Sequence, residues 1–402
     1  MRLCKFKNYA CLLIVGLLCT NTNIAQRSNC SNALSLVKTD SLYNFMQELI
    51  GKKEVIINGN PQLIKSRYAF HSGNALAATY LANTCASYGF TIRNIDYSST
   101  GRNVIAEKVG SQFPNKSIML CAHYDCVGGT NSNFQGADDN ASGCAALLEA
   151  ARVLRNIDFP YTIQLAFWDE EEAGLIGSKA FPSGGSGLPE LLTVINLDMI
   201  AWDGNKDSLA MIHATPSVPL SLDFADRLHH VIGKHKLPLK SFVKNPGEPN
   251  TDHQSFWNRD IPAIGLTEDY DNDFSPNWHR FSDSIENIHI PYFVNMSKLA
   301  IMALCEFAQE GLTGLPKLVS GKEFEIYPNP IDHHFCIKSE NLNVFNKLQI
   351  SNLTGEILFE AKDLSQGKNY FILPENFAPG LYFVSLFGSN QHCVTKKIVV
   401  NK

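Results

Sequence analysis

The chain has 402 residues, of which 45% are hydrophobic and 18% are charged, and this composition is that of a globular protein and excludes a disordered one. The length suits one large domain together with a smaller one. The formal net charge of −5 gives no electrostatic basis for binding nucleic acid or an anionic membrane surface. We therefore expect a small-molecule or peptide substrate.

The N-terminus has the pattern of an export signal. Arg2, Lys5 and Lys7 precede an apolar run over residues 10–19, and a polar stretch ends at Ala25-Gln26. This order predicts a signal peptide over residues 1–26, because the run is too short to anchor the chain across a bilayer. We expect the protein to be secreted or held at the cell surface. The eight cysteines after residue 26 could then form disulfides, whose pairing the sequence leaves open.

Strand-like and helix-like segments alternate between about residues 31 and 311. Short apolar runs predict strands at 117–122, 162–168, 193–197 and 261–266, and helical spacing predicts helices at 140–154 and 291–309. The alternation predicts an α/β fold with a mixed, largely parallel sheet flanked by helices. Polar clusters follow several of the apolar runs, at the edge of such a sheet where ligands bind.

The composition changes after residue 311. Glycine and proline predict a linker over residues 312–323, and the remaining residues, 324–402, read as short strands separated by turns at Asn329-Pro330 and Pro379-Gly380. This part is expected to form a small all-β sandwich.

Five polar elements in the α/β region could carry chemistry. They are His123-Tyr124-Asp125, residues 136–143, Glu170-Glu171-Glu172, Asp198 and His279. Two histidines with several carboxylates at strand ends describe a nitrogen and oxygen site suited to zinc. Two divalent ions about 3.5–4 Å apart need a bridging carboxylate, and a further carboxylate that binds no metal must move the proton of the attacking water.

The same elements, HYD, GADDNASG, DEEEAGLIGS, INLDM and WHRFSDSIENI, resemble the zinc aminopeptidases of metallopeptidase family 28 (clan MH) over roughly residues 100–310. The resemblance implies the zinc exopeptidase fold and a zinc peptidase domain over residues 31–311. It also implies two zinc ions (Zn2+) per chain and the removal of N-terminal residues from peptides. The implied metal ligands are His123, Asp139 and Asp198 for one ion, and Asp139, Glu172 and His279 for the other.

The resemblance also assigns catalytic roles. Glu171 matches the general base that activates the bridging water, and Asp125 matches the acid that orients His123. Two alternatives stay open in the motifs. Asp138 could be the bridging acid in place of Asp139, and Glu170 could shift the run of acids by one position.

Other residues and other activities also stay open. Asp252 and His253 could line the site or belong to a surface loop, and Trp278 could line a substrate pocket or pack beside His279. The alternative functions are a glutaminyl cyclase-like enzyme with a single zinc, a carboxypeptidase of the same family, and a binding module that has lost the chemistry. Residue specificity and oligomeric state are not predicted.

The C-terminal segment resembles a second family. Tyr327-Pro328-Asn329-Pro330, residues 380–384 and the terminal stretch 396–400 resemble the C-terminal sorting domain of type IX secretion substrates. The resemblance implies export across the outer membrane through the type IX secretion machinery as a partner. The alternative is a generic β-sandwich that binds a protein or a carbohydrate.

Overall fold

The computed structural model describes residues 30–129, 133–181, 187–311, 324–339, 345–352, 356–362, 364, 367–374, 377–388 and 393–401. The predicted signal peptide, 1–26, and the predicted linker, 312–323, lie outside these residues.

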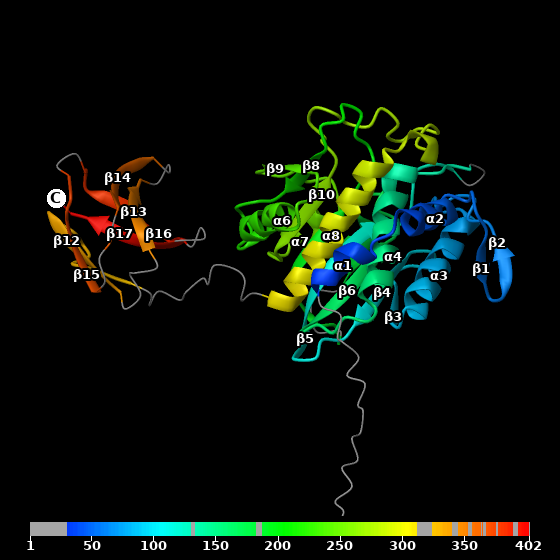
Figure 1. Ribbon diagram of the computed structural model, residues 1–402, viewed down its shortest axis with the longest axis horizontal. Helices are drawn as coiled ribbons and strands as arrows, with labels where there is room; N and C mark the ends of the chain where they lie inside the picture. Colours follow the sequence, from blue (N-terminus) through cyan, green and yellow to red (C-terminus); the bar gives the residue numbers. More distant parts are fainter. Residues whose placement is uncertain are drawn as a thin grey trace, which may run out of the picture.

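A mixed sheet forms the centre of the first part of the chain (Figure 1). Its order among the described residues is β3-β4-β6-β5-β7-β10-β8-β9, and the neighbours β6, β5, β7 and β10 run parallel. The strands are β3 Thr91–Asp96, β4 Arg102–Lys108, β5 Phe113–His123, β6 Tyr161–Trp168, β7 Glu190–Leu197, β8 Leu209–His213, β9 Lys240–Lys244 and β10 Ala263–Thr267. A separate antiparallel pair joins β1 Val55–Ile57 to β2 Asn60–Gln62. The predicted mixed, largely parallel sheet is confirmed.

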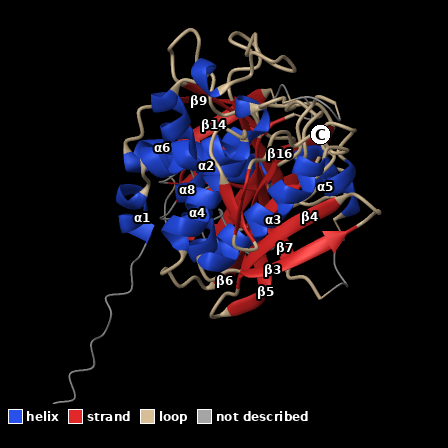
Figure 2. Cartoon of the chain, turned by 90° about the vertical axis from the view of Figure 1, so that its right-hand side faces the viewer, coloured by secondary structure: helices blue, strands red, loops and turns tan. Residues whose placement is uncertain are grey.

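Helices cover both faces of this sheet (Figure 2). One face carries α3 Ser72–Ser87, α4 Gly143–Leu154, α6 Ser221–His235 and α8 Ile290–Glu310, with α1 Cys30–Leu36 and α2 Thr39–Leu49 packed outside them. The short helices α5 Ile176–Ala180 and α7 His253–Trp257 lie on the other face. Two further turns are η1 Ala137–Ser142 and the 3-10 turn η2 Ile285–Asn287.

The central strands are apolar on both faces because both faces are buried. In β5, Ile118 and Leu120 point into the larger core under α4 and α8, whereas Met119 and Cys121 point into a second core that contains Trp168. The alternation ends at His123, the last residue of β5 and a polar side chain at the carboxyl edge of the sheet.

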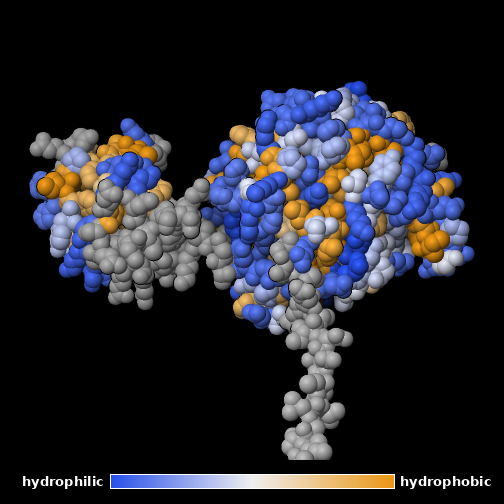
Figure 3. Space-filling model, viewed as in Figure 1, coloured by the Kyte–Doolittle hydropathy of each residue, from blue (hydrophilic) through white to orange (hydrophobic). Residues whose placement is uncertain are grey.

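Helix α8 is the one helix of the described chain that is long and apolar enough to span a membrane. Within its most apolar stretch, 72% is buried inside the protein, as in the core helix of a soluble domain. Helices α1 and α4 pack against it, and apolar residues show between hydrophilic ones over this face (Figure 3). A disulfide between Cys30 and Cys305 links α1 to α8.

The C-terminal residues form two antiparallel sheets. The first has the order β11-β12-β15 and the second the order β14-β13-β16-β17. Their strands are β11 Glu325–Tyr327, β12 His334–Ser339, β13 Phe345–Ser351, β14 Ile357–Lys362, β15 Gly367–Ile372, β16 Gly380–Gly388 and β17 Cys393–Val400. Phe335, Ile350 and Val384 from both sheets share one buried core. The predicted all-β sandwich is confirmed.

Candidate metal centre

His123 and Asp198 meet because of the register of two parallel strands. Cys121 of β5 pairs with Asn196 of β7, so the residues two positions further along, His123 and Asp198, come side by side where both strands end. The Nε2 atom of His123 lies 3.5 Å from Oδ1 of Asp198. Both side chains are buried. The carboxyl edge of the sheet thus places an imidazole against a carboxylate.

Asp139 lies between the two predicted histidine ligands. Its Oδ1 is 3.2 Å from Nε2 of His123, and its Oδ2 is 3.4 Å from Nε2 of His279. Asp138 turns away from this cluster, and its Oδ1 accepts the backbone N–H of Ala201 at 2.8 Å. Of the two aspartates that the sequence leaves open as the bridge, the structure brings Asp139 to both histidines.

The chain before α4 departs from the expected helix. The sequence predicts a helix from residue 140, but α4 begins at Gly143, and residues 137–142 form a π-helical turn in which Asp139 and Asn140 have non-helical dihedral angles. The Asp283 carboxylate accepts the backbone N–H groups of Asp138 at 2.8 Å and Asp139 at 3.0 Å. These bonds satisfy two N–H groups at the start of the turn, where the first donors of a helix have no partner within it, and they hold Asp139 toward the histidines.

The acidic loop after β6 supplies two more carboxylates. Glu172 Oε2 lies 2.9 Å from Nε2 of His279, and Glu171 Oε2 lies 3.9 Å from Nε2 of His123. The Asp125 carboxylate accepts the backbone N–H groups of Glu171 and Glu172, at 3.1 and 3.2 Å, and its Oδ1 lies 3.4 Å from Nδ1 of His123. Asp125 therefore contacts the histidine and the acidic loop together.

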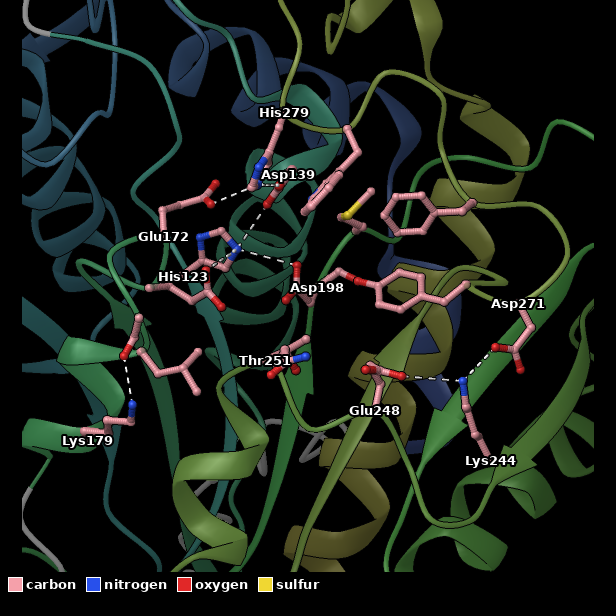
Figure 4. A pocket seen from close by; sticks show the side chains of 18 residues that line it. His123, Asp139, Glu172, Lys179, Asp198, Lys244, Glu248, Thr251, Asp271 and His279 are labelled. Atoms are coloured by element: carbon pink, nitrogen blue, oxygen red, sulfur yellow. Dashed lines mark hydrogen bonds and ion pairs between the residues drawn. The ribbon is translucent and has the colours of Figure 1, made fainter.

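Two groups of side chains in the described residues could each hold a metal ion (Figure 4). Within each group the ligand atoms lie within 4.8 Å of one another, and the two groups are His123, Asp139, Asp198 and Asp139, Glu172, His279. Imidazole nitrogens with carboxylate oxygens are the donors that zinc accepts. The residues present therefore fit two zinc ions that share one carboxylate.

The pKa values of the clustered side chains also fit a metal site. Burial raises the pKa of Glu172 to about 7, and it also raises the pKa of Asp198. Burial lowers the pKa of His279, but its contacts with Asp139 and Glu172 outweigh this and raise that pKa to about 10. Several carboxylates this close together are stabilised by positive charge, which protons supply here and metal ions can replace.

The cluster opens into a cavity of about 680 Å³. Met199, Tyr270, Phe274 and Trp278 line one part of it, and the Trp278 ring stacks on His279 with 3.8 Å between ring centroids. Trp278 is 44% exposed, so it both packs on the histidine and faces the cavity. These wall residues come from loops, whose contacts the sequence pattern does not encode.

Asp252 and His253 are fully buried, so a surface loop is excluded for them. Asp252 lies close enough to Glu171 for its charge to contribute to the raised pKa of that side chain, for which burial is the larger cause. His253 instead contacts the backbone of Glu248 and the hydroxyl of Thr251. Neither residue is in the two metal-binding groups.

The fold is α/β, with a mixed sheet between helices. A cluster of histidines and carboxylates at the carboxyl ends of its parallel strands is typical of metal-dependent hydrolases. Comparison with protein families agrees. Residues 103–304, half of the chain, match the family model of peptidase family M28, and the chain belongs to this family. Residues 325–401 match the secretion system C-terminal sorting domain, which supports secretion or surface localisation. Both resemblances seen in the sequence are confirmed.

Curated relatives share moderate identity with the chain. Leucine aminopeptidase 2 of Trichophyton rubrum is 26% identical over 274 residues, which cover 60% of this chain and 51% of that protein. Leupeptin-inactivating enzyme 1 of Streptomyces exfoliatus is 28% identical over 205 residues, which cover 48% of this chain and 43% of that protein. The chain thus spans about half the length of the curated relatives it matches.

Solved structures share the fold. The LapA aminopeptidase of Legionella pneumophila superposes with a TM-score of 0.59 at 22% identity, covering 70% of this chain and 75% of that one. BSAP, a zinc aminopeptidase from Bacillus subtilis, gives 0.57 at 15% identity, covering 68% and 96%. The glutaminyl cyclase of Porphyromonas gingivalis gives 0.54 at 20% identity, covering 67% and 99%. At these identities the likeness concerns the fold.

Proposed function

We propose that this protein is a secreted aminopeptidase that uses two zinc ions to remove N-terminal residues from peptides. The observation that carries the proposal is the position of Asp139, whose two carboxylate oxygens face two different histidines. A shared carboxylate of this kind suits a pair of metal ions better than a single one. Relatives of this chain that are named leucine aminopeptidase support the removal of N-terminal residues as the reaction.

Each site residue has a proposed role. His123, Asp139 and Asp198 would hold one ion, and Asp139, Glu172 and His279 the other. The ions would polarise the substrate carbonyl and lower the pKa of a water molecule in the site.

Glu171 lines the cavity but belongs to neither ligand group, which leaves its carboxylate for proton transfer. It would take a proton from the attacking water and donate it to the departing amine. Burial raises the pKa of Glu171 well above that of an ordinary glutamate, which suits a group that must accept and return a proton.

Asp125 would act on this base through the backbone. Its carboxylate fixes the N–H groups of Glu171 and Glu172 while facing His123, so the base and two ligands keep one relative position. Asp125 is a positioning residue in this proposal.

The main alternative is a glutaminyl cyclase with one zinc, because a cyclase shares the fold. The presence of two complete ligand groups favours the two-metal peptidase. A carboxypeptidase of the same family would have the same metal ligands. The end of the peptide that is cleaved therefore distinguishes an aminopeptidase from a carboxypeptidase.

The test combines metal counting with substrate choice. Purified, zinc-loaded protein is assayed for bound metal. It is also assayed, with and without chelator, for cleavage of aminoacyl chromophores and N-blocked peptides and for release of residues from the C-terminus of peptides. We expect about two zinc ions per chain and chelator-sensitive release of free N-terminal residues only. One zinc with cyclisation of N-terminal glutamine would replace the proposal with a cyclase, and release from the C-terminus would replace it with a carboxypeptidase.

We also propose that the chain divides into a signal peptide (1–26), a peptidase domain (31–311), a linker (312–323) and a sorting domain (324–402) that engages the type IX secretion machinery. The match of residues 325–401 to the sorting domain supports the last part. N-terminal sequencing and the mass of the exported protein test the division. A mature chain that begins at Met1 would contradict the signal peptide.

A further inference from the structure

One wall of the cavity carries charged side chains in addition to those of the metal centre. Lys244, Glu248 and Asp271 line it, on the side away from Lys179 in the close view (Figure 4). Lys244 Nζ lies 2.6 Å from Oδ1 of Asp271 and 3.6 Å from Oε2 of Glu248. The wall therefore contains a close ion pair and a second carboxylate at a longer distance.

This wall has an excess of negative charge. One lysine stands against two carboxylates, and the contact with Asp271 raises the pKa of Lys244, so the lysine stays charged. Asp271 is its nearer partner, which leaves the charge of Glu248 less compensated. The Glu248 side chain is 39% exposed and can meet a ligand in the cavity. Lys244 is occupied by two acids, so the wall does not suit a carboxylate of the substrate.

The backbone at Glu248 is held in place by two buried histidines. His213 accepts the N–H of Glu248 at Nδ1, at 3.0 Å, and His253 donates from Nε2 to the carbonyl of Glu248, at 2.7 Å. Burial lowers the pKa of both histidines, to about 4 for His253, so both are neutral and can keep these opposite roles. The loop comes so close to His213 that a Cβ at Gly247 would meet its side chain at 2.7 Å. Such a support fixes the position from which the Glu248 carboxylate reaches the cavity.

The same cavity has aromatic walls suited to a long side chain. Tyr270, Phe274 and Trp278 form a chain of ring contacts, with centroids 5.2 and 5.4 Å apart. Lysine and arginine side chains lay their methylene stems along apolar surface and place their charge against a carboxylate or an aromatic face. An aromatic wall and an excess carboxylate in the same cavity offer both.

We propose that Glu248 is a specificity-determining residue that favours substrates whose N-terminal residue has a positively charged side chain, lysine or arginine. This inference rests on the proposed aminopeptidase function and adds the class of substrate. His213 and His253 are positioning residues for Glu248, and Asp271 keeps Lys244 from neutralising it.

The experiment separates side-chain charge from every other feature of the substrate. Lysyl and norleucyl p-nitroanilides have the same methylene stem and the same α-amino group, and differ in the terminal ammonium. They are compared on the zinc-loaded full-length protein and on Glu248→Gln, which keeps the backbone contacts to both histidines. Glu306→Gln is the matched control, because Glu306 also pairs with a lysine, Lys234, but lies on α8 outside the cavity.

We expect the wild-type protein to prefer the lysyl substrate, and the ratio of kcat/KM for lysyl over norleucyl to fall by about tenfold in Glu248→Gln, as for the loss of one charge-assisted contact. The control should keep the wild-type ratio. A wild-type protein without the preference would overturn the inference. So would an equal loss on both substrates, since Glu248 would then act on the shared α-amino group or on the fold.

A binding measurement keeps this result distinct from failure of the proposed function. If the zinc-loaded protein hydrolyses neither these two substrates nor the other aminoacyl chromophores, the aminopeptidase proposal fails. Calorimetric titration with free lysine and free norleucine then still tests whether Glu248 favours a positively charged side chain. Tighter binding of lysine that is lost in Glu248→Gln supports the inference, and equal binding of the two amino acids overturns it.

Discussion

Asp125 Oδ1 accepts the backbone N–H of Glu171 at 3.1 Å, although the two residues follow different strands, β5 and β6. The same oxygen lies 3.4 Å from Nδ1 of His123, and Oδ2 accepts the N–H of Glu172. The resemblance to family 28 implies for Asp125 only the orientation of His123. In the structure one buried carboxylate also ties the acidic loop to the end of β5, which makes the position of the proposed base depend on the proposed ligand.

Replacing Asp125 with asparagine should damage both functions of this carboxylate. The amide nitrogen of Asn cannot accept a hydrogen bond, so either the N–H of Glu172 or the N–H of Glu171 loses its partner. We expect zinc affinity or kcat/KM to fall by about 10–100-fold, as for other groups that orient metal ligands. Chelator competition and steady-state kinetics measure the two quantities. Asp96→Asn, at an exposed ion pair with Arg102, is the control and should leave both unchanged.

Glu171→Gln should separate catalysis from metal binding. Glutamine has nearly the same shape but cannot take a proton, and Glu171 is outside both ligand groups. We expect full zinc content and a kcat lowered by about 10²–10⁴-fold. Metal analysis and kinetics on the same preparation check this. A variant with bound zinc and wild-type turnover would remove Glu171 from the role of base.

Asp283→Ala should weaken the site through the turn that presents Asp139. Asp283 is 2% exposed, and its two oxygens accept the N–H groups of Asp138 and Asp139. Without them two buried N–H groups lose their partners, which costs about 1–3 kcal/mol each. We expect lower stability to denaturant and weaker zinc binding. A variant with unchanged zinc affinity would show that the turn holds Asp139 by itself.

The sequence predicts those parts of the site that follow directly after apolar runs. His123, Glu171, Glu172 and Asp198 come within four residues of the ends of buried strands, so a strand prediction already places them at one edge of the sheet. Asp283 could not be found in this way. It lies on a loop 144 positions after Asp139 and acts on backbone N–H groups, and no periodicity encodes such a contact.

The loops around the cavity were also beyond the sequence pattern. Asp269 and Tyr270 follow β10 in a polar segment without a core pattern, yet Asp269 is buried and the Tyr270 hydroxyl donates to the carbonyl of Asp198 at 3.3 Å. The sequence predicts that the helix begins at residue 140, because capping residues and alanine at 140–142 give a helical pattern. In the structure α4 begins three residues later, at Gly143, after a turn that the hydrogen bonds of Asp283 hold. Local propensity yields here to a tertiary contact.

The disulfide between Cys30 and Cys305 gives a stability prediction. It joins α1 to α8 across 275 positions, so it closes most of the first part of the chain into a loop. Changing both cysteines to serine should lower the free energy of unfolding by about 2–5 kcal/mol, since the unfolded chain regains the freedom that the bond removes. Urea denaturation of the double variant and of the wild type, with and without reductant, measures this. Equal midpoints for the oxidised wild type and the double variant would contradict it.

The buried side chain of His253, which donates to the carbonyl of Glu248, gives a prediction of how stability depends on pH. Burial lowers the pKa of His253 to about 4 in the folded protein, below its ordinary value of 6.5. As the pH falls below about 6.5 the unfolded chain therefore binds a proton at this residue before the folded protein does. The contribution of His253 to stability is complete above pH 6.5 and is lost as the pH falls toward 4, with a slope of up to about 1.4 kcal/mol per pH unit.

His253→Gln should reduce this slope. The glutamine amide can still donate to the Glu248 carbonyl but has no proton to gain, so the variant should lose less stability than the wild type between pH 6.5 and 4. The free energy of unfolding is measured by urea denaturation at several pH values, with zinc removed from both proteins so that release of the metal in acid does not contribute. Parallel curves for the two proteins would mean that His253 is not the group that takes up the proton. A shallower curve for the variant would support the neutral, hydrogen-bonded histidine that holds Glu248 in the cavity wall.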